Sequence, residues 1–413
     1  MINTEHIHKE LSHVSWQGYL RKNGRIGIRN KVLIIYTVEC ASHVAKHIAG
    51  EINVDDVDVI GFYGCCDNEY AVRMLIAMIR HPNIGAVLAV GLGCEYVQAE
   101  KLRDIARSEG KPSESILIQQ SGGTRSSIDL GKQLVNTMLC EIRSVPRGVM
   151  KVSDLVIGAE CGGSDYTSGL AGNAVVGRMF DHLVDLGGTA IFEELMEAVG
   201  LRDYLSGRAA DETVAEEIKW AYDKMVDHCK TIRQYGISPG NFMGGLSTIE
   251  EKSMGAVVKS GSRPIVGLTK VSVPPKKPGL WLLDSVPDPY YMGFGKTNPN
   301  DSEGLMDLIS CGCHLVIFIT GRGSVIGSPI SPTYKVTGNS ATYENLSDDL
   351  DFNAGLCITE GRSPDEMGSK LLRAVIDCCK GERSRAELHG HKEYLIPYKY
   401  QDIENYLPPC KNI

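Results

Sequence analysis

Four cysteines of this sequence stand directly after apolar segments, at points where β-strands would end: Cys40, Cys65, Cys94 and Cys161. In an open parallel sheet, ligands gather beyond the carboxyl ends of the strands, so these thiols could meet at one edge. Three converging thiolates would suit iron, either as a single ferrous ion or as a cluster with one open iron position. The alternative is that each thiol packs as a small buried side chain, as cysteines often do.

An arginine between two glycines is a second candidate for chemistry. Arg322 follows a long apolar segment, where its planar guanidinium could bind a carboxylate with two hydrogen bonds. Arg29 and Asn30 directly precede the first apolar segment and could bind the same anion. The glycine-rich segments 91–93 and 321–327 lack the spacing of a dinucleotide-binding loop, which disfavours a nicotinamide cofactor. The arginines could equally be solvated loop residues.

Side chains that could move protons lie on both sides of Cys161 and farther along the chain. Glu160 and Asp165 are close to this cysteine in sequence, and either carboxylate could act as a general base or as an oxygen ligand of a metal. Lys252 is a candidate base or an anchor for a carboxylate. The ordinary alternatives are a helix N-cap for Asp165 and an exposed helical position for Lys252. The chain has no H-E-x-x-H, G-x-x-x-x-G-K-[ST] or G-x-S-x-G motif, which excludes the familiar metalloprotease, P-loop and hydrolase sites.

The composition is typical of a globular chain and excludes several classes of partner. The 413 residues include 43 basic and 51 acidic side chains, with a formal net charge of -8 and no block of lysine or arginine. Binding to nucleic acid or to an anionic membrane surface is therefore not expected. No apolar segment approaches a membrane span, and the first residues lack a signal-peptide pattern. The 13 cysteines, an odd number, favour free thiols in a reducing cytoplasm.

Short segments rich in valine, isoleucine and leucine alternate with stretches of helical periodicity, which is the pattern of parallel βα units. The predicted fold class is α/β with two lobes, each with a mostly parallel sheet and flanking helices, similar to a Rossmann fold. The strands of the first sheet are predicted at residues 31–36, 57–62, 84–90 and 154–157. The helices between and after them are predicted at residues 43–50, 67–80, 95–109 and 124–144.

The same patterns predict three parts of the chain. Residues 1–17 are expected to be an N-terminal arm with little order. Residues 18–235 are expected to form the first α/β lobe, with its cysteine-bearing strand ends and a long connecting helix at about 208–234. Residues 236–413 are expected to form the second α/β lobe. This second lobe would contain strands at 279–284 and 314–319, a helix near 302–311, and the Gly-Arg-Gly-Ser loop.

Several motifs together resemble the altronate/galactarate dehydratase family, and they occur in the family's order from about residue 18 to residue 361. They are the segments 18–30, 81–83 with 90–95, 161–165 with Ser168, Gly169 and Asn173, 187–189 with Glu194, 238–241, and 320–324 through 351–355. The resemblance implies an enzyme that needs ferrous iron or another divalent metal. It also implies elimination of the β-substituent of a 2-hydroxy acid, which gives a 2-keto acid after tautomerisation.

The resemblance implies a hydro-lyase acting on a sugar acid or another 2,3-dihydroxy acid, or alternatively a sulfolactate sulfo-lyase that releases sulfite. Such an elimination needs a carboxylate anchor, a base for the C2 proton, and an acid or a metal at the leaving group. The expected metal ligands are Cys65, Cys94 and Cys161, with an iron-sulfur cluster as an alternative cofactor. The expected acid and base residues are Glu160, Asp165 and Lys252. The expected substrate contacts are Arg29, Asn30, Asn241, Arg322 and Ser324.

Two departures from the family pattern bear on this prediction. Full-length members carry a small SAF-type domain before the segment that begins at Gly18, and only 17 residues precede it here. The chain is therefore expected to be the large subunit of a homo- or hetero-oligomer with a separate small SAF-type subunit. Gly61 stands where the family has a histidine, so Tyr63 or Cys66 must substitute, or the substrate differs. A non-catalytic family member and an iron-sulfur redox protein are the alternatives of another class.

Overall fold

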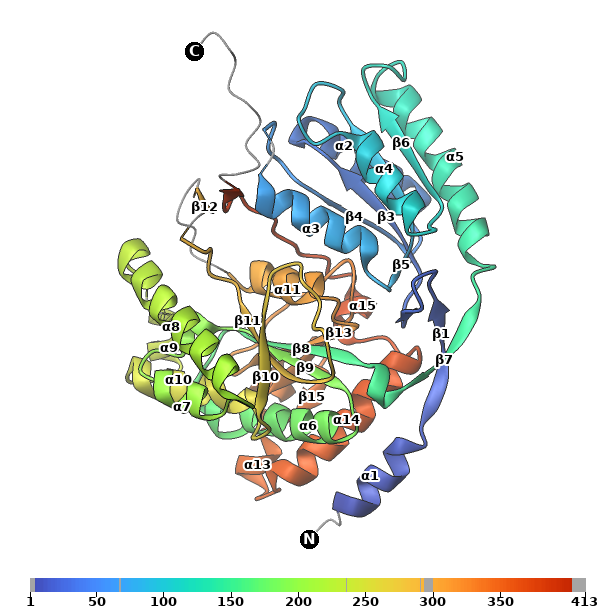
Figure 1. Ribbon diagram of the computed structural model, residues 1–413. Helices are drawn as coiled ribbons and strands as arrows, with labels where there is room; N and C mark the ends of the chain where they lie inside the picture. Colours follow the sequence, from blue (N-terminus) through green and yellow to red (C-terminus); the bar gives the residue numbers. More distant parts are fainter. Residues whose placement is uncertain (1–3, 67, 235, 290, 293–299, 403–413) are drawn as a thin grey trace.

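The protein is an α/β molecule with two lobes, as predicted. The structure is a computed structural model that describes residues 4–66, 68–234, 236–289, 291–292 and 300–402 (Figure 1). Each lobe is built on a parallel sheet, and a small antiparallel sheet lies between the lobes. No helix among the described residues is long and apolar enough to cross a membrane.

The upper lobe in Figure 1 contains a four-stranded parallel sheet in the order β4-β3-β5-β6. Its strands are β3 (Lys31–Tyr36), β4 (Val57–Gly61), β5 (Ile84–Gly91) and β6 (Ser113–Leu117). Its helices are α2 (Glu39–Ile52), α3 (Glu69–Arg80), α4 (Ala99–Ser108) and α5 (Thr124–Ile142). On β3, Val32 and Ile34 pack with α2 and α5, whereas Leu33 and Ile35 pack with α3 and α4. Because helices cover both faces of the sheet, the sequence of β3 is a continuous run of apolar residues.

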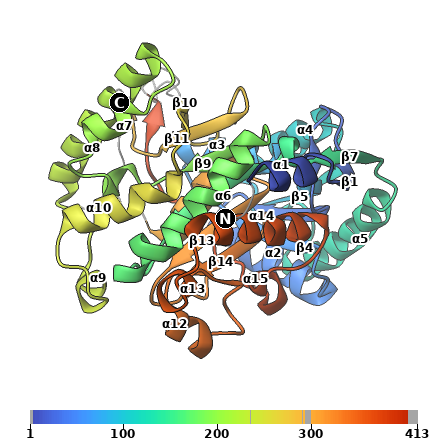
Figure 2. The same cartoon turned by 90° about the horizontal axis from the view of Figure 1, so that it is seen from below.

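The lower lobe contains a seven-stranded sheet in the order β10-β11-β9-β8-β13-β14-β15, in which every pair is parallel. Its strands are β8 (Val156–Cys161), β9 (Thr189–Phe192), β10 (Ile265–Lys270), β11 (Gly279–Asp284), β13 (Leu315–Thr320), β14 (Thr333–Thr337) and β15 (Phe352–Asn353). The helices α6 (Asn173–Asp185) and α14 (Pro364–Lys380) pack side by side on one face (Figure 2). On the other face, α11 (Asp301–Ser310) packs against α3, which joins the two lobes through one apolar core.

Seven further helices of the described residues follow β9 in the chain. They are α7 (Arg202–Gly207), α8 (Glu212–Ile232), α9 (Pro239–Met243), α10 (Ile249–Val257), α12 (Ser340–Asn345), α13 (Leu356–Thr359) and α15 (Arg385–His389). A π-helical turn, η2 (Ser168–Gly172), leads into α6. Two short strands, β12 (Tyr291–Met292) and β16 (Gln401–Asp402), pair with each other.

One strand and one predicted boundary differ from the sequence analysis. The segment 154–157 was expected in the first sheet, but β8 is a central strand of the lower sheet, between β9 and β13. The strands divide between the lobes before β8, so the predicted division at residues 235 and 236 falls inside the lower lobe. The reason is β7 (Arg147–Lys151), which follows α5 and pairs antiparallel with β1 (Ser15–Leu20). This pairing carries the chain from the upper lobe to the lower lobe.

Residues 4–17 are ordered, which corrects the expectation of an N-terminal arm with little order; residues 1–3 lie outside the described residues. Residues Thr4–Ser12 form α1, and Ile7 and Leu11, one helical turn apart, are buried in the core of the lower lobe. The following strand β1 also pairs with β2 (Ile26–Gly27). The helical spacing of Ile7 and Leu11 is too short a pattern to be recognised in the sequence.

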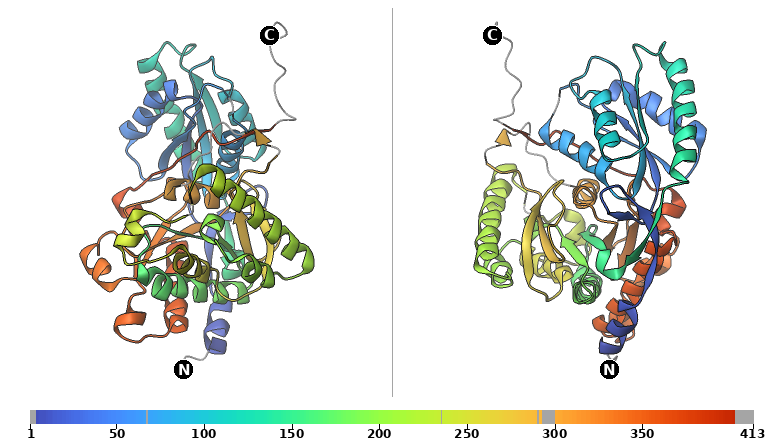
Figure 3. Two further views of the ribbon diagram at one scale, coloured as in Figure 1. Left: turned by 90° about the vertical axis from the view of Figure 1, so that its left-hand side faces the viewer. Right: turned by 45° about the vertical axis from the view of Figure 1, so that its right-hand side comes forward.

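The end of the chain returns to the upper lobe as an extended segment, residues 391–400, which we call the C-terminal strap. Figure 3 shows the strap, in dark red, crossing between the two lobes. Lys392 forms an ion pair with Asp58 at 2.6 Å, and the hydroxyl of Tyr394 donates to that of Tyr36 at 2.7 Å. The strap thus fastens the end of the lower lobe to strands of the upper one.

Candidate active site

A cavity of about 350 Å3 opens at the carboxyl ends of the central strands of the lower sheet. Four residues predicted from the sequence line it: Cys161, Asn241, Lys252 and Arg322. Cys161 ends β8 and Arg322 follows β13, which is the neighbouring parallel strand. Asn241 and Lys252 come from α9 and α10, which cover this edge. The cavity therefore lies where an open parallel sheet places its ligands.

Lys252 is buried on α10 and forms an ion pair with Glu197, which lies in the helical turn after β9. Its ammonium also donates to the carbonyl of Gly236. Burial alone would lower the pKa of Lys252, but the charge and hydrogen bond of Glu197 outweigh burial and raise the pKa. Burial raises the pKa of Glu197 in spite of the nearby ammonium. Lys252 is therefore not the exposed helical lysine that was the alternative expectation. Together, Lys252 and Glu197 place a proton donor beside a carboxyl group with increased proton affinity.

Two carboxyl groups that the sequence analysis did not single out also line the cavity, Glu197 and Asp301. Asp301 begins α11 and lies against Gly162, where a side chain would collide with its carboxylate. Burial raises the pKa of Asp301, and the charge of Glu197 raises it further. Glu197 could have been inferred, because it closely follows the apolar segment that forms β9. Asp301 carries no comparable signal, because it is an ordinary first residue of a helix.

Glu160 lies behind the cavity wall, on β8. Its carboxyl group is buried against Gly304 of α11, and its Oε2 atom has no hydrogen-bond partner among the described residues. Burial raises the pKa of Glu160 well above its usual value, and the charge of Glu193 adds to this effect. Glu160 is thus a buried carboxyl group with increased proton affinity, one layer away from the cavity.

The end of β8 is held by a buried ion pair. The backbone N–H of Cys161 donates to Glu194 Oε1 at 2.6 Å, and Glu194 pairs with the fully buried Lys259. Glu194 has a φ of 83°, a backbone conformation that costs energy for any residue except glycine. Burial raises the pKa of the Cys161 thiol, whose sulfur lies 3.0 Å from the hydroxyl of Ser164. Cys161 is therefore a neutral thiol at the wall of the cavity.

Asp165 and Asn241 use their polar atoms to hold the loop after β8. Asp165 Oδ1 accepts from the N–H of Thr167 at 2.8 Å, and Oδ2 accepts from the side chain of Asn339 at 3.1 Å. Asn241 caps α9 with its oxygen, and its Nδ2 donates to the carbonyl of Ser164 at 3.0 Å. Asp165 therefore caps the start of the helix that leads into η2, which was the ordinary alternative to a catalytic role. Asn241 links this loop to α9.

Arg322 and Ser324 lie in the loop after β13. Arg322 is exposed at the cavity, where its Nη1 donates to the carbonyl of Gly240 at 2.9 Å. Ser324 points into its own loop, where its hydroxyl accepts from the N–H of Ile326 at 3.3 Å. Of the two, Arg322 is the residue whose position suits contact with a bound anion.

Arg29 and Asn30 lie away from this cavity, at the junction of the lobes. Arg29 forms a two-point ion pair with Glu387 of α15, at 2.7 and 2.9 Å, and donates to the carbonyl of Cys378 at 3.1 Å. Asn30 accepts from Arg21 at 2.9 Å and donates to a carbonyl of α5 at 2.8 Å. Both side chains hold separate segments together, which differs from the substrate contacts expected of them.

The three cysteines predicted as metal ligands are not brought together. Cys65 and Cys94 are exposed at the carboxyl ends of the upper sheet, whereas Cys161 is buried at the end of a strand of the lower sheet. Partial desolvation and the neighbouring thiols of Cys94, Cys40 and Cys66 raise the pKa of Cys65. The thiols that follow the first three apolar segments are thus neighbours, as expected, and the fourth is separate because β8 belongs to the other sheet.

No three histidine, cysteine, aspartate or glutamate side chains in the described part of the chain lie close enough to hold a metal ion. As they are placed, neither the predicted thiols nor the carboxyl groups around the cavity fit a divalent ion or a cluster. The cavity itself combines two cations, Lys252 and Arg322, with two carboxyl groups of raised pKa, Glu197 and Asp301.

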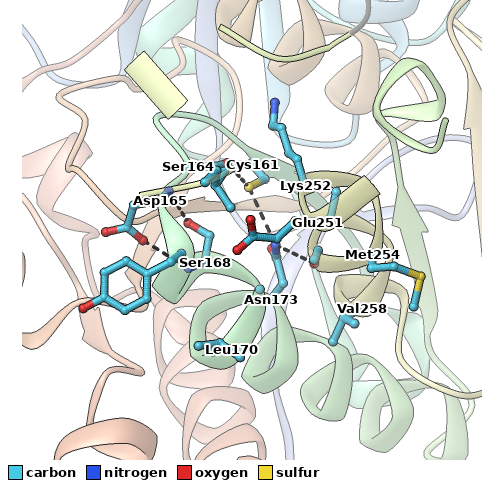
Figure 4. A pocket seen from close by; sticks show the side chains of 15 residues that line it. Cys161, Ser164, Asp165, Ser168, Leu170, Asn173, Glu251, Lys252, Met254 and Val258 are labelled. Atoms are coloured by element: carbon cyan, nitrogen blue, oxygen red, sulfur yellow. Dashed lines mark hydrogen bonds between the residues drawn. The ribbon is translucent and has the colours of Figure 1, made fainter. Parts of the chain in front are cut away.

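A second compartment of about 290 Å3 adjoins the polar cavity and shares Cys161, Ser164 and Lys252 with it. Figure 4 shows the ammonium of Lys252 extending away from Leu170 and Val258, which lie on the far side of this compartment. We call the two spaces the polar cavity and the apolar compartment. Together they form the candidate active site.

A parallel-sheet fold with cations and buried carboxyl groups at its strand ends is typical of an enzyme that acts on a small anionic molecule. Comparison with known families identifies which one. Residues 152–401 match the family model described as D-galactarate/altronate dehydratase, C-terminal. Residues 18–143 match that described as D-galactarate dehydratase/altronate hydrolase, second domain. The chain belongs to the D-galactarate/altronate dehydratase family, as its motifs predicted.

Curated relatives agree with this assignment. The chain is 31% identical to altronate dehydratase of Bacillus subtilis and 32% identical to that of Escherichia coli, with 92% of this chain and 77% of each relative covered. It is 30% identical to (2R)-sulfolactate sulfo-lyase subunit beta of Chromohalobacter salexigens, with 95% of this chain and 99% of the relative covered. All three relatives are lyases or subunits of one, and the chain is a lyase of the same family.

Proposed function

We propose that this lyase removes water from a 2,3-dihydroxy acid, such as a sugar acid, and forms a 2-keto-3-deoxy acid. In this reaction C2 loses a proton and C3 loses its hydroxyl group, and the two leave as one molecule of water. The remaining enol tautomerises to the 2-keto acid, with no external oxidant or reductant. The observation that supports the proposal is the meeting of Arg322, Lys252 and Glu197 in one cavity.

Each of these three side chains suits one part of the reaction. The guanidinium of Arg322 can bind the substrate carboxylate with two parallel hydrogen bonds. Loss of the C2 proton creates an enediolate with a second negative charge, which Arg322 and Lys252 together would stabilise. Glu197, whose pKa burial raises, would accept the C2 proton. The Lys252 ammonium would then give a proton to the departing hydroxide.

Turnover by site variants tests this proposal. Wild type should convert at least one member of a panel of 2,3-dihydroxy acids to a 2-keto acid, assayed with and without added ferrous iron. Lys252→Met should lose about 100-fold to 10,000-fold of this activity, as expected for a lost acid or base. The control is Lys219→Met, which removes an exposed ion pair on α8. Activity of Lys252→Met within a few-fold of the control would contradict the assignment.

A second candidate is sulfite release from (2R)-sulfolactate. It is supported by the match to a sulfo-lyase subunit, which extends over 99% of that relative. The same cations would bind a sulfonate at C3, and the same base would remove the C2 proton, with sulfite leaving in place of hydroxide. Sulfite detected from sulfolactate, with no keto acid formed from any dihydroxy acid, would favour this candidate.

We further propose that the chain works with a small SAF-type subunit, in an oligomer in the cytoplasm, with ferrous iron or another divalent metal as cofactor and an iron-sulfur cluster as the alternative. The name of the sulfo-lyase relative, which is a subunit, supports the first point. The free cysteines of the described residues suit a reducing compartment. Co-expression with a SAF-domain protein should give a complex by light scattering and raise the turnover. Full turnover by the chain alone would contradict the need for a partner.

A further inference from the structure

We propose that the substrate of this lyase has a hydrocarbon end, and that the apolar compartment beside Lys252 binds it. The inference deepens the proposed function, on which it rests, and names the class of dihydroxy acid. It begins from the composition of the compartment wall. The apolar lining residues are Tyr166, Leu170, Leu246, Met254, Ala256 and Val258.

Three polar side chains of the same wall already form hydrogen bonds within the protein. Ser168 accepts from the N–H of Asp165 at 3.1 Å, and Glu251 accepts from the N–H and the hydroxyl of Ser247 at 2.8 and 2.7 Å. Asn173 donates to the carbonyl of Gly255 at 2.9 Å. The hydroxyl groups of a sugar chain would leave water here and find few new partners, which is unfavourable. A hydrocarbon chain has no such loss.

One buried oxygen atom, Asn173 Oδ1, could accept a hydrogen bond from the ligand near the polar cavity. Asn173 Oδ1 has no hydrogen-bond partner among the described residues, and the amide lies beside Cys161, with Nδ2 at 3.8 Å from its sulfur. A single hydroxyl group of the substrate could donate to this oxygen. The arrangement therefore suits hydroxyl groups near C2 and C3, and carbon alone beyond them.

The two spaces are adjacent and share three lining residues, which is the arrangement that one molecule extending through both would need. Cys161, Ser164 and Lys252 belong to both linings, whereas Arg322 lines the polar cavity and not the apolar compartment. A carboxylate bound by Arg322 would direct the rest of the chain past Cys161. At the far end, Leu170 is 65% exposed and Met254 is 49% exposed. An apolar chain laid against them would remove this surface from water.

Binding and turnover of two six-carbon acids test the inference with the full-length chain. The non-reactive 2-hydroxyhexanoate should bind, by calorimetry, at least about tenfold more tightly than a hexonate that carries hydroxyl groups on C2 to C6. In kinetics, kcat/KM should rise about threefold to fourfold for each methylene from 2,3-dihydroxybutanoate to 2,3-dihydroxyhexanoate.

Variants of the wall give the sharper readout. Leu170→Asn combined with Met254→Gln keeps the size of both side chains but makes the wall polar. This double variant should lower the preference for 2,3-dihydroxyhexanoate over the hexonate about tenfold. It should leave the melting temperature near that of wild type, because both side chains are about half or more exposed. The matched control is Leu130→Asn on α5 of the upper lobe, where the leucine is 39% exposed; its preference should equal that of wild type.

The possible failures are distinguishable. If the hexonate is the better substrate and the double variant keeps wild-type selectivity, the inference is overturned and the dehydratase proposal stands. If no dihydroxy acid is converted but 2-hydroxyhexanoate binds through Leu170 and Met254, the dehydratase proposal fails and the binding site stands. If the double variant changes the oligomeric state, measured by light scattering, without changing selectivity, the wall is a protein interface and the inference is wrong.

Discussion

The position of Arg322 after a central strand of the lower sheet explains its proposed role in binding the substrate carboxylate. It follows β13, next to the strand that ends in Cys161, and it reaches the polar cavity with one hydrogen bond to the backbone of α9. We expect Arg322→Lys to lower kcat/KM about 30-fold to 1000-fold, because lysine keeps the charge but cannot form two parallel bonds to a carboxylate. The melting temperature should change by less than about 2 °C. Steady-state kinetics within a few-fold of wild type would show that Arg322 is only a surface residue.

The thiols allow a prediction about the proposed cofactor. A cysteine must be deprotonated to bind a metal, and burial raises the pKa of Cys161 without a nearby thiol to share an ion. Cys94, in contrast, is exposed and neighbours Cys65. Because no three possible metal ligands meet among the described residues, we expect Cys94→Ser and Cys161→Ser both to leave the iron content of anaerobically prepared protein unchanged. A loss in Cys94→Ser alone would mean that thiols of the upper lobe hold the ion. An equal loss in both variants would mean that the lobes rearrange to share one ion.

At the scale of elements, strands covered on both faces were predicted best. The predicted bounds of β3 and β11 coincide with those observed, because a doubly covered strand is a continuous apolar segment bounded by polar residues. The sheet to which β8 belongs was predicted wrongly. A parallel strand looks the same in either sheet, and only the antiparallel pairing of β7 with β1 determines where the chain goes next.

The candidate site was predictable where residues follow strands and unpredictable where distant segments meet. Cys161 and Arg322 were found because they end neighbouring strands. Arg29 was wrongly predicted to contact the substrate. Its partner, Glu387, lies 358 residues away, and neither segment carries a sequence pattern that predicts their ion pair. Asp301 was missed for a related reason, since its place at the cavity depends on how α11 packs against β8.

His314 links three elements and makes their joint stability depend on pH. Its Nδ1 accepts from the N–H of Val156 on β8 at 3.0 Å, and its Nε2 donates to the carbonyl of Ile26 on β2 at 2.9 Å. Burial lowers the pKa of His314 to about 3. The folded protein therefore keeps this histidine neutral, while the unfolded chain takes up a proton below about pH 6.5. Its contribution to stability is complete above that pH and is lost as the pH falls toward 3.

Chemical denaturation between pH 7.5 and pH 5 measures this effect. Wild type should lose about 2 kcal/mol of unfolding free energy over this range from His314 alone. Burial also lowers the pKa of His81, so that residue adds a loss of the same sign. The test is therefore the difference between wild type and His314→Gln, because glutamine can keep both hydrogen bonds without titrating. Identical pH slopes for the two proteins would contradict the link.

At the scale of the whole molecule, the C-terminal strap decides whether the two lobes behave as one unit. Its Lys399 is buried between α3 and α11, where the ammonium lies 2.6 Å from Glu303 and 3.5 Å from Asp307. The hydroxyl of Tyr70, on α3, donates to Asp307 at 2.6 Å. The strap thus supplies the cation for two carboxyl groups of the lower lobe at the place where α3 of the upper lobe packs on α11. The stability of the contact between the lobes therefore depends on Lys399.

We expect Lys399→Met to destabilise the protein by about 3 to 5 kcal/mol, because it leaves two buried carboxyl groups without a cation. Lys380→Met, which breaks an exposed pair with Asp377, should cost no more than about 1 kcal/mol. Burial already raises the pKa of Asp307 to about 7, so protonation can relieve the variant at low pH. The difference between Lys399→Met and wild type, measured by urea unfolding, should therefore be larger at pH 8.5 than at pH 5.5. A cost equal to that of Lys380→Met at both pH values would mean that the lobes hold together through apolar packing alone.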